Sequence, residues 1–498
     1  MNEQTIKNTA TNEDAVKERE RKQFVKMTQT PIPRLIIGLG IPTMLSMMVT
    51  SLYNLADTAF VSNLGVSATA AISNLLALMS IIQAIGFTYG MGSGSIVSSQ
   101  LGKRDREGAD RTASSAMFIA AASGLLIMTF GLIFLEPIMK LFGADSGQTL
   151  KYAKDYAFYI LLAAPFMCMS YVLNNVLRAE GKAVLSMIGL IVGAVINIGL
   201  DPILIIGFGM EVNGAGLATC ISQIISFGVL LFMFLTKKTV VRLRFKAIDF
   251  KFITCGKIII TGFPSFCRQI LASICTTLLN NIALKYGGDD AQAALGVVNK
   301  MFMLAFSISL GIGQGYQPVL GYNYSAKRFD RVRIGYLFTL AFSTGLMMIF
   351  AVACAVLAPL IMRAFSLKDV AFEVGTMTLR LQCISMPLLP LNFMAGLSYQ
   401  VVGNKALASL LSISRQGLFF IPAVLVLPAI WQIGGVESCQ MVSDIFAFLF
   451  AIPFTIIFLN GLRKKQRLVE EEKAKQAGQV CDEAELIPEI QQDFSDDA

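Results

Sequence analysis

Long apolar segments alternate with short polar breaks along nearly the whole chain. A run of about 18 or more apolar residues is long enough to cross a lipid bilayer as a helix. We therefore predict an all-α integral membrane protein with twelve transmembrane helices, which lie near residues 35–61, 67–98, 113–138, 153–177, 183–208, 214–235, 252–284, 292–321, 334–361, 374–401, 406–430 and 437–460.

The second half of this pattern repeats the first at a shift of about 222 residues. The segment "GLGIP" at 38–42 corresponds to "ITGFP" at 260–264, and "GMGSGS" at 90–95 to "GIGQG" at 311–315. Parallel repeats of this kind form two bundles around a central cavity. We expect two pseudo-symmetric six-helix bundles, divided as an N-terminal tail (1–33), an N-lobe (34–235), a linker (236–251), a C-lobe (252–461) and a C-terminal tail (462–498).

Composition and charge support the membrane assignment. Only 15% of the residues are charged, against about 25% in an average soluble domain, and the mean hydropathy is +0.64. Lys and Arg gather in alternate loops, such as "GKRDREGADR" at 102–111 and "AKRFDRVR" at 326–333. Because positive loops stay inside the cell, we expect a multi-pass protein of the cytoplasmic (inner) membrane with both termini cytoplasmic. The net charge of +8 then reflects topology and not a nucleic-acid partner.

Several kinds of chemistry are disfavoured. The chain contains no His, and its nine Cys are scattered without a CxxC pair. The glycines of "GMGSGS" are not followed by Gly-Lys-Ser/Thr, so they do not form an ATP-binding loop. The first 30 or so residues lack the apolar core of a signal peptide. We expect no enzyme activity and no cofactor, and a transporter of this kind would use an ion gradient.

Two carboxylates interrupt the apolar spans. Asp57 lies in the first span and Asp201 in the fifth, and each has a polar residue one helical turn earlier, Tyr53 and Asn197. Thr219 in the sixth span can add an oxygen at similar depth. Acids within a membrane span are costly and are candidates for function. Oxygen ligands of this type suit Na⁺, and two close carboxylates equally favour retention of a proton. A purely structural role for the acids is the alternative.

Other polar residues in the spans are candidates for a substrate cavity. They are Gln83, Asn174 and Asn175 in the first half and Arg268 and Gln314 in the second. Either Arg268 or Arg415 can pair with Asp444, so an interior salt bridge is as plausible as contact with a substrate.

The chain resembles the multidrug and toxic compound extrusion (MATE) family, specifically its MepA/DinF-like prokaryotic branch, over about residues 30–460. The resemblance depends on the two-lobe plan and on Pro42, Asp57, Asn197-x-x-x-Asp201 and Thr219. It implies that Asp57, Asn197, Asp201 and Thr219 form a Na⁺ or H⁺ site in the N-lobe. It further implies that Pro42 is a hinge, that Tyr53 and Asn174 line the same lobe, and that the lobes enclose a V-shaped cavity.

Taken together, these patterns predict a multidrug efflux antiporter. We expect it to work as a monomer in the lipid bilayer on small drug-like substrates. It would export bulky apolar or cationic compounds in exchange for Na⁺ or H⁺. The alternatives are a lipid-linked sugar flippase of the same superfamily, an integral-membrane enzyme and a channel.

Overall fold

Helices make up all of the regular secondary structure in the described part of the chain. The structure is a computed structural model that describes residues 18–62, 66–144, 147–236, 239–249, 253–365 and 367–493. The side chains of residues 53–70, 72–74 and 476–493 lie outside this description. Eleven helices or helical stretches within it are long and apolar enough to cross a membrane, so the prediction of an all-α membrane protein is confirmed.

The N-terminal half consists of helices joined by short connections. These are α2 (Ile32–Ser62), α3 (Val66–Gly102), α4 (Arg106–Ile133), α5 (Leu135–Leu141), α6 (Gly147–Ala179), α7 (Ala183–Pro202), the π-helical turn η1 (Ile203–Gly207) and α8 (Glu211–Leu235). The third span was predicted to begin near residue 113, but α4 begins at Arg106. The reason is that the Asp105 side chain caps the helix by accepting a hydrogen bond from the Gly108 amide at 2.9 Å.

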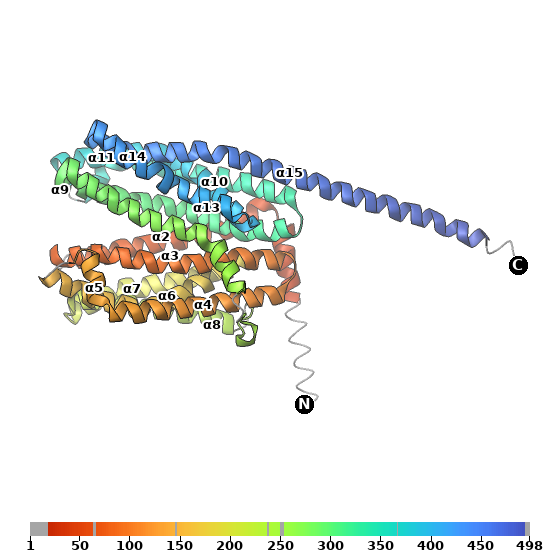
Figure 1. Ribbon diagram of the computed structural model, residues 1–498, viewed down its shortest axis with the longest axis horizontal. Coiled ribbons are helices and arrows are strands. Elements are labelled where there is room, and N and C mark those ends of the chain that lie inside the picture. The colour runs from red at the N-terminus through yellow and green to blue at the C-terminus, as the bar shows by residue number, and fades with distance from the viewer. Residues whose placement is uncertain are drawn as a thin grey trace, which may run out of the picture.

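The linker contains the short η2 (Phe245–Ala247), and the C-terminal half then repeats the helical pattern. Its elements are α9 (Ile253–Ser325), α10 (Phe329–Ala364), α11 (Asp369–Ser385), η3 (Met386–Leu388), α12 (Leu389–Val402), α13 (Lys405–Ile413), the π-helical η4 (Ser414–Phe420), α14 (Ile421–Trp431) and α15 (Ile433–Asp493). Helix α15 continues far beyond the bundle (Figure 1).

Helix α9 supplies two spans. It is interrupted at Gly288, where φ is 66° and ψ is −164°, a conformation that is essentially restricted to glycine. Its two parts return to the same segment of α3, because Ile258 packs on Gly92 and the Gln314 amide nitrogen lies 3.8 Å from the Met91 sulfur. The chain therefore reverses within α9, which brings the number of spans to the predicted twelve.

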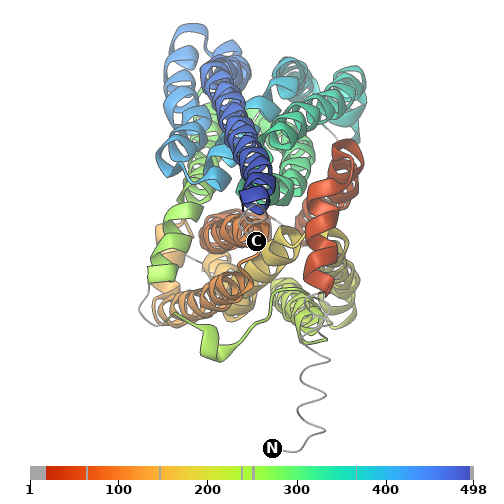
Figure 2. The same ribbon diagram turned by 90° about the vertical axis from the view of Figure 1, so that its right-hand side faces the viewer.

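The two halves of the chain form two bundles that lie side by side. In Figures 1 and 2 the orange to yellow-green helices α3–α8 occupy one side, and the green-cyan to blue helices α10–α15 occupy the other. Helix α2 lies against both, since it packs on α7 and on α9. The boundaries predicted for the two lobes and the tails stay predictions.

Both ends of the described chain leave the bundles at the same end of the molecule, which we call the terminal end. Residues 18–29 are helical and pack there, where Arg328 donates a hydrogen bond to the Thr28 carbonyl at 2.7 Å. Lys465 of α15 contacts the Tyr324 hydroxyl at the same end. The basic loops thus gather at the terminal end, as the predicted topology requires. Which side of the membrane this end faces stays a prediction.

Close contacts between glycines hold the lobes together towards the terminal end. A Cβ atom on Gly262 of α9 would lie 1.8 Å from the Thr88 carbonyl oxygen of α3, and one on Gly315 would lie 2.5 Å from the Gly40 Cα of α2. Only residues without a side chain permit such an approach. We call Gly40, Gly92, Gly262 and Gly315 the glycine seam. The glycine runs of the sequence therefore serve packing between the lobes.

Away from the seam the lobes separate. A groove of about 450 Å³ lies between α3 and the first part of α9, and its walls include Ala77, Ile81 and Ile274. The lobes are thus joined near the terminal end and diverge beyond it, which agrees with the expected V shape.

Candidate functional site

Two of the predicted site residues, Asn197 and Thr219, meet between α7 and α8, and a third, Asp201, lies one helical turn after Asn197. Asn197 and Asp201 of α7 are 1% and 0% exposed, and Thr219 of α8 is 3% exposed. The Asn197 amide donates a hydrogen bond to the Thr219 hydroxyl at 3.3 Å. The helices approach closely because α7 presents glycine here: a Cβ on Gly193 would lie 2.9 Å from the Ser226 Cβ.

The end of α7 is irregular directly after Asp201. Pro202 provides no backbone donor, and the chain continues as the π-helical turn η1. Interruptions of this type recur at the binding sites of transporters. The sequence contains a signal for this irregularity, because Pro202 follows Asp201 within an otherwise continuous apolar run.

The oxygen atoms of the site suit a small cation or a shared proton. The Asn197 Oδ1 atom is buried and accepts no hydrogen bond from the part of the chain that the structure describes. A buried acceptor without a donor is unfavourable, and either Na⁺ or a protonated carboxyl group would satisfy it. Tyr53 and Asp57 belong to α2, but their side chains lie outside the described residues.

Pro42 lies inside α2, and hydroxyl groups close to it donate to backbone carbonyls of the same helix. Thr43 donates to the Leu39 carbonyl at 2.7 Å, and Ser46 donates to the Thr43 carbonyl at 2.8 Å. Such bonds satisfy backbone groups near a proline inside a membrane. Pro42 cannot donate to the Gly38 carbonyl, so α2 lacks one backbone bond here, and this is the point at which it bends most readily.

A cavity of about 190 Å³ lies between the lobes, and we call it the central cavity. Three predicted residues line it: Gln83, Asn174 and Asn197. The Gln269 amide of α9 donates to the Gln83 oxygen of α3 at 3.3 Å, so a hydrogen bond crosses between the lobes within the cavity. Apolar side chains such as Met167, Met303 and Phe306 complete the walls.

Two predicted cavity residues lie elsewhere. Asn175 is buried against α3, where its amide nitrogen would lie 2.5 Å from a Cβ on Gly90. Gln314 is fully buried beside Met91 next to the glycine seam. Both residues fill contacts between helices and do not line the central cavity.

Arg178 is a lining residue that the sequence did not single out. It is 3% exposed and is the only charged side chain among the described residues that line the central cavity. Its Nε donates weakly to the Asn174 carbonyl at 3.4 Å, and its Nη1 has no hydrogen-bond partner in the described chain. It could have been found, because it lies four residues after Asn174 and hence on the same helix face.

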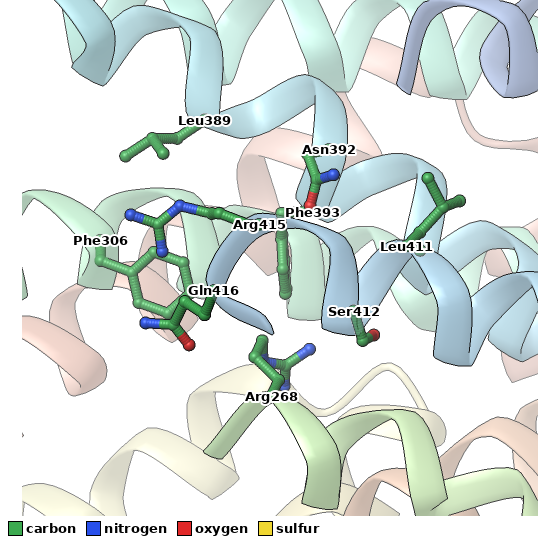
Figure 3. Close-up of a pocket in the computed structure, with 10 residues that line it drawn as sticks. Arg268, Phe306, Leu389, Asn392, Phe393, Leu411, Ser412, Arg415 and Gln416 are labelled. Atoms are coloured by element: carbon green, nitrogen blue, oxygen red, sulfur yellow. The ribbon is translucent and has the colours of Figure 1, made fainter. Parts of the chain in front are cut away.

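Arg268 lines a separate small pocket in the C-lobe, which we call the C-terminal pocket (Figure 3). Its guanidinium group lies 5.2 Å from the centre of the Phe393 ring. Arg415 lines the same pocket and pairs with the buried Asp444, with 2.8 Å between Nε and Oδ1. The structure thus decides between the two predicted partners of Asp444 in favour of Arg415.

Comparisons with known proteins agree with this architecture. The MatE family profile matches residues 42–203 and 264–426. The chain is 26% identical over 443 residues to the multidrug export protein MepA of Staphylococcus aureus (strain MRSA252), covering 89% of this chain and 97% of the relative. MepA of Staphylococcus saprophyticus is also 26% identical, with 86% and 94% covered.

Comparison with solved structures also shows a similarity to MATE transporters. A crystal structure described as MATE in complex with MaL6 superposes with a TM-score of 0.84 at 25% identity, covering 88% of this chain and 99% of that one. An outward-facing multidrug resistance MATE family transporter of the MOP superfamily gives a TM-score of 0.84 at 25% identity, with 88% and 98% covered.

Proposed function

The chain belongs to the multidrug and toxic compound extrusion (MATE) family, a family of membrane transporters that are not enzymes, and from this premise we propose that it exports drug-like compounds against an ion gradient. The substrates are bulky apolar or cationic molecules, and the counter-ion is Na⁺ or H⁺. It works as a monomer in the cytoplasmic membrane, with the terminal end inside the cell.

The observation that carries this proposal is the position of Asn197. This residue lines the central cavity and also donates to Thr219 beside the buried Asp201. One side chain therefore connects the wall of the substrate cavity with the oxygen atoms of the ion site. A change in the ion site can alter the cavity without a long chain of intermediates.

The ion affects substrate binding in two ways: it neutralises the negative charge of the site, and it changes the conformation of the cavity. Asp201, together with Asp57, provides negative charge that a cationic substrate and an entering ion both neutralise. An ion that binds one conformation more tightly than the other shifts the equilibrium between them. Pro42 provides the place where α2 bends, so that ion binding changes the cavity and releases the substrate outward.

The test is efflux of ethidium from proteoliposomes under a Na⁺ gradient and, separately, a pH gradient. We expect one gradient to drive efflux by the wild type, and we expect Asp57→Asn and Asp201→Asn to abolish it. Asp289→Asn changes an exposed acid in the reversal of α9 and serves as the control that retains efflux.

The outcomes separate the possible functions. Full efflux by both Asp→Asn variants would leave the acids structural and remove the coupling assignment. If the wild type moves no dye under either gradient, the drug-export proposal is wrong and a lipid or sugar cargo takes its place.

A further inference from the structure

The segment 18–30, which we call the strap, lies across the terminal end of the molecule. Its residues 18–29 form a helix, and α2 begins two residues after Thr30, at Ile32. Figure 2 faces the terminal end, and there the red helix at the N-terminus runs from the yellow-green helices of the first half towards the green-cyan α10. No described residue of the strap lines the central cavity, so its contacts need a separate explanation.

One side of the strap packs on the N-lobe, at the turn between α6 and α7. The Gln23 amide donates a hydrogen bond to the Glu180 carbonyl at 2.5 Å. The next residue of the turn is Gly181, where φ is 77° and a Cβ would lie 2.6 Å from the Gln23 amide nitrogen. Between α3 and α4, the guanidinium of Arg104 lies 4.4 Å from the centre of the Phe24 ring. The strap therefore rests directly on the backbone of the N-lobe.

The turn that receives the strap is itself fixed in place. The Glu180 side chain is fully buried, and its two oxygens accept hydrogen bonds from the Val241 and Val240 amides at 2.8 and 3.0 Å. The carboxylate also pairs with Lys182 at 3.0 Å. Both amides belong to the linker between the lobes. The strap thus docks on a platform that the turn and the linker form together.

The other side of the strap contacts the C-lobe, where three side chains donate to three backbone carbonyls at the end of the strap. These bonds join Asn323 to Met27 at 3.0 Å, Arg328 to Thr28 at 2.7 Å and Arg331 to Thr30 at 2.5 Å. The last carbonyls of a helix have no partner within it, and its C-terminus attracts cations. The C-lobe donors therefore recognise the end of the strap helix.

The strap joins the two lobes at the end that the glycine seam closes. Transport by two rocking lobes requires each end to open in turn, and opening the terminal end moves Glu180 of the N-lobe away from Arg328 of the C-lobe. A helix rises about 1.5 Å per residue, so Gln23 and Thr28 lie only about 8 Å apart along its axis. A helix of this length cannot keep both sets of contacts when the lobes separate.

We propose that the strap is a latch, which stabilises the conformation closed at the terminal end and must leave the C-lobe before this end opens. Bonds that exist in one conformation only shift the equilibrium towards it. The C-lobe contacts are the ones that break, because the strap continues directly into α2 of the N-lobe. The inference goes beyond the proposed export function, since it requires the lobes to move apart but no particular substrate or ion.

The test follows two signals in the purified full-length protein. Hydrogen exchange of the amides of residues 18–30 reports release of the strap. Maleimide labelling of Cys255, which is buried on α9 near the seam, reports opening of the terminal end. In the double variant Arg328→Gln/Arg331→Gln we expect both rates to rise about tenfold or more, as the loss of hydrogen bonds from charged donors implies. Gln23→Ala weakens the opposite side of the strap and should raise both rates as well.

Arg333→Gln is the matched control. It removes a charge from the same part of α10, but Arg333 lines a hollow that faces Leu462 and Arg463 of α15 and not the strap. Because a single surface charge contributes little to stability, both rates should stay within about twofold of the wild type. Cys354, buried in α10, should stay unlabelled in every folded variant.

Three results would overturn the latch. The first is faster exchange of the strap in the folded double variant with unchanged labelling of Cys255. The second is an equal rise in Arg333→Gln. The third applies if the double variant does not fold, and is unchanged labelling of Cys255 in Gln23→Ala. Neither signal depends on ethidium transport, so a failure of the export proposal leaves this test intact.

Discussion

The buried carboxylate of Asp444 accepts hydrogen bonds from three side chains. Its Oδ1 accepts from Arg415 at 2.8 Å and from Gln440 at 2.9 Å, and its Oδ2 accepts from Ser385 at 3.1 Å. These donors come from three separate segments of the C-lobe. The carboxylate is thus a structural link between helices, and it also keeps Arg415 in place at the C-terminal pocket.

Asp444→Asn should destabilise the protein strongly. The amide has the same size, but it leaves Arg415 buried without a counter-charge, and breaking a buried pair in this way costs about 3–5 kcal/mol. Thermal unfolding in detergent should show a clearly lowered Tm. The control Glu136→Gln breaks exposed pairs with Lys140 and Lys154 and should leave the Tm nearly unchanged. Equal Tm values for the two variants would contradict the structural role.

Sequence reasoning at the residue scale identified which side chains are unusual but not how they pair. Acids and amides stand out in apolar runs, so Asn197, Asp201 and Asp444 could be selected directly. The choice between Arg268 and Arg415 as the partner of Asp444 depends on how η4 approaches α15, which no local pattern specifies. Arg178 was missed because the predicted fourth span ended at residue 177, one residue before it.

Helix α2 combines a proline with hydroxyl residues that donate to its own backbone. An interior proline removes a hydrogen bond and costs about 3 kcal/mol in a helix. Thr43 and Ser46 add bonds to the Leu39 and Thr43 carbonyls, whereas the bond that Pro42 removes is the one to the Gly38 carbonyl. The resulting segment lies at the seam, where a Cβ on Gly311 would lie 2.3 Å from the Met44 Cα.

Pro42→Ala should slow transport without removing binding. Alanine restores the N–H donor that a straight helix needs, and so disfavours the bent form of α2. We expect ethidium efflux under the driving gradient to fall at least about tenfold. A tenfold change corresponds to a free-energy difference of about 1.4 kcal/mol, which is less than the cost of a proline inside a helix. Ethidium affinity should change less than about threefold. Pro359→Ala, inside α10, is the matched control, and equal efflux by the two variants would exclude Pro42 as the hinge.

At the element scale, the existence of the spans was predictable and their ends were not. Apolar length is a strong signal, and it led to the correct fold. The start of α4 depends on a cap by Asp105, and the break within α9 depends on the backbone of Gly288. Both are single-residue effects that average hydropathy does not register.

At the scale of the whole molecule, equivalent glycines of the two sequence repeats form equivalent contacts between the lobes. Gly40 and Gly262 occupy corresponding positions in the two halves, and each faces a helix of the other lobe. The repeat could be recognised from the sequence, whereas its contact partners could not, because they join segments that are far apart along the chain. The seam closes the lobes near the terminal end, while the groove between α3 and α9 remains open beyond it.

Gly262→Ala should force the seam apart. The added Cβ would lie 1.8 Å from the Thr88 carbonyl oxygen, and because that atom belongs to the backbone of α3, the lobes themselves must move. Cys255, which is buried on α9 near the seam, then becomes a natural reporter. We expect maleimide labelling of Cys255, followed by mass spectrometry, to rise several-fold in this variant and ethidium efflux to fall.

Gly256→Ala is the matched control, because it makes the same change on the same helix where a Cβ meets no atom within 4 Å. Both variants gain about the same helix propensity, about 1 kcal/mol, so a difference in labelling reports the seam. Cys354, buried in α10 of the C-lobe, should stay unlabelled if the fold is intact. Equal labelling of Cys255 in the two variants would mean that the seam does not control access at the terminal end. A selective rise would show that the glycine seam limits access to Cys255 at the terminal end.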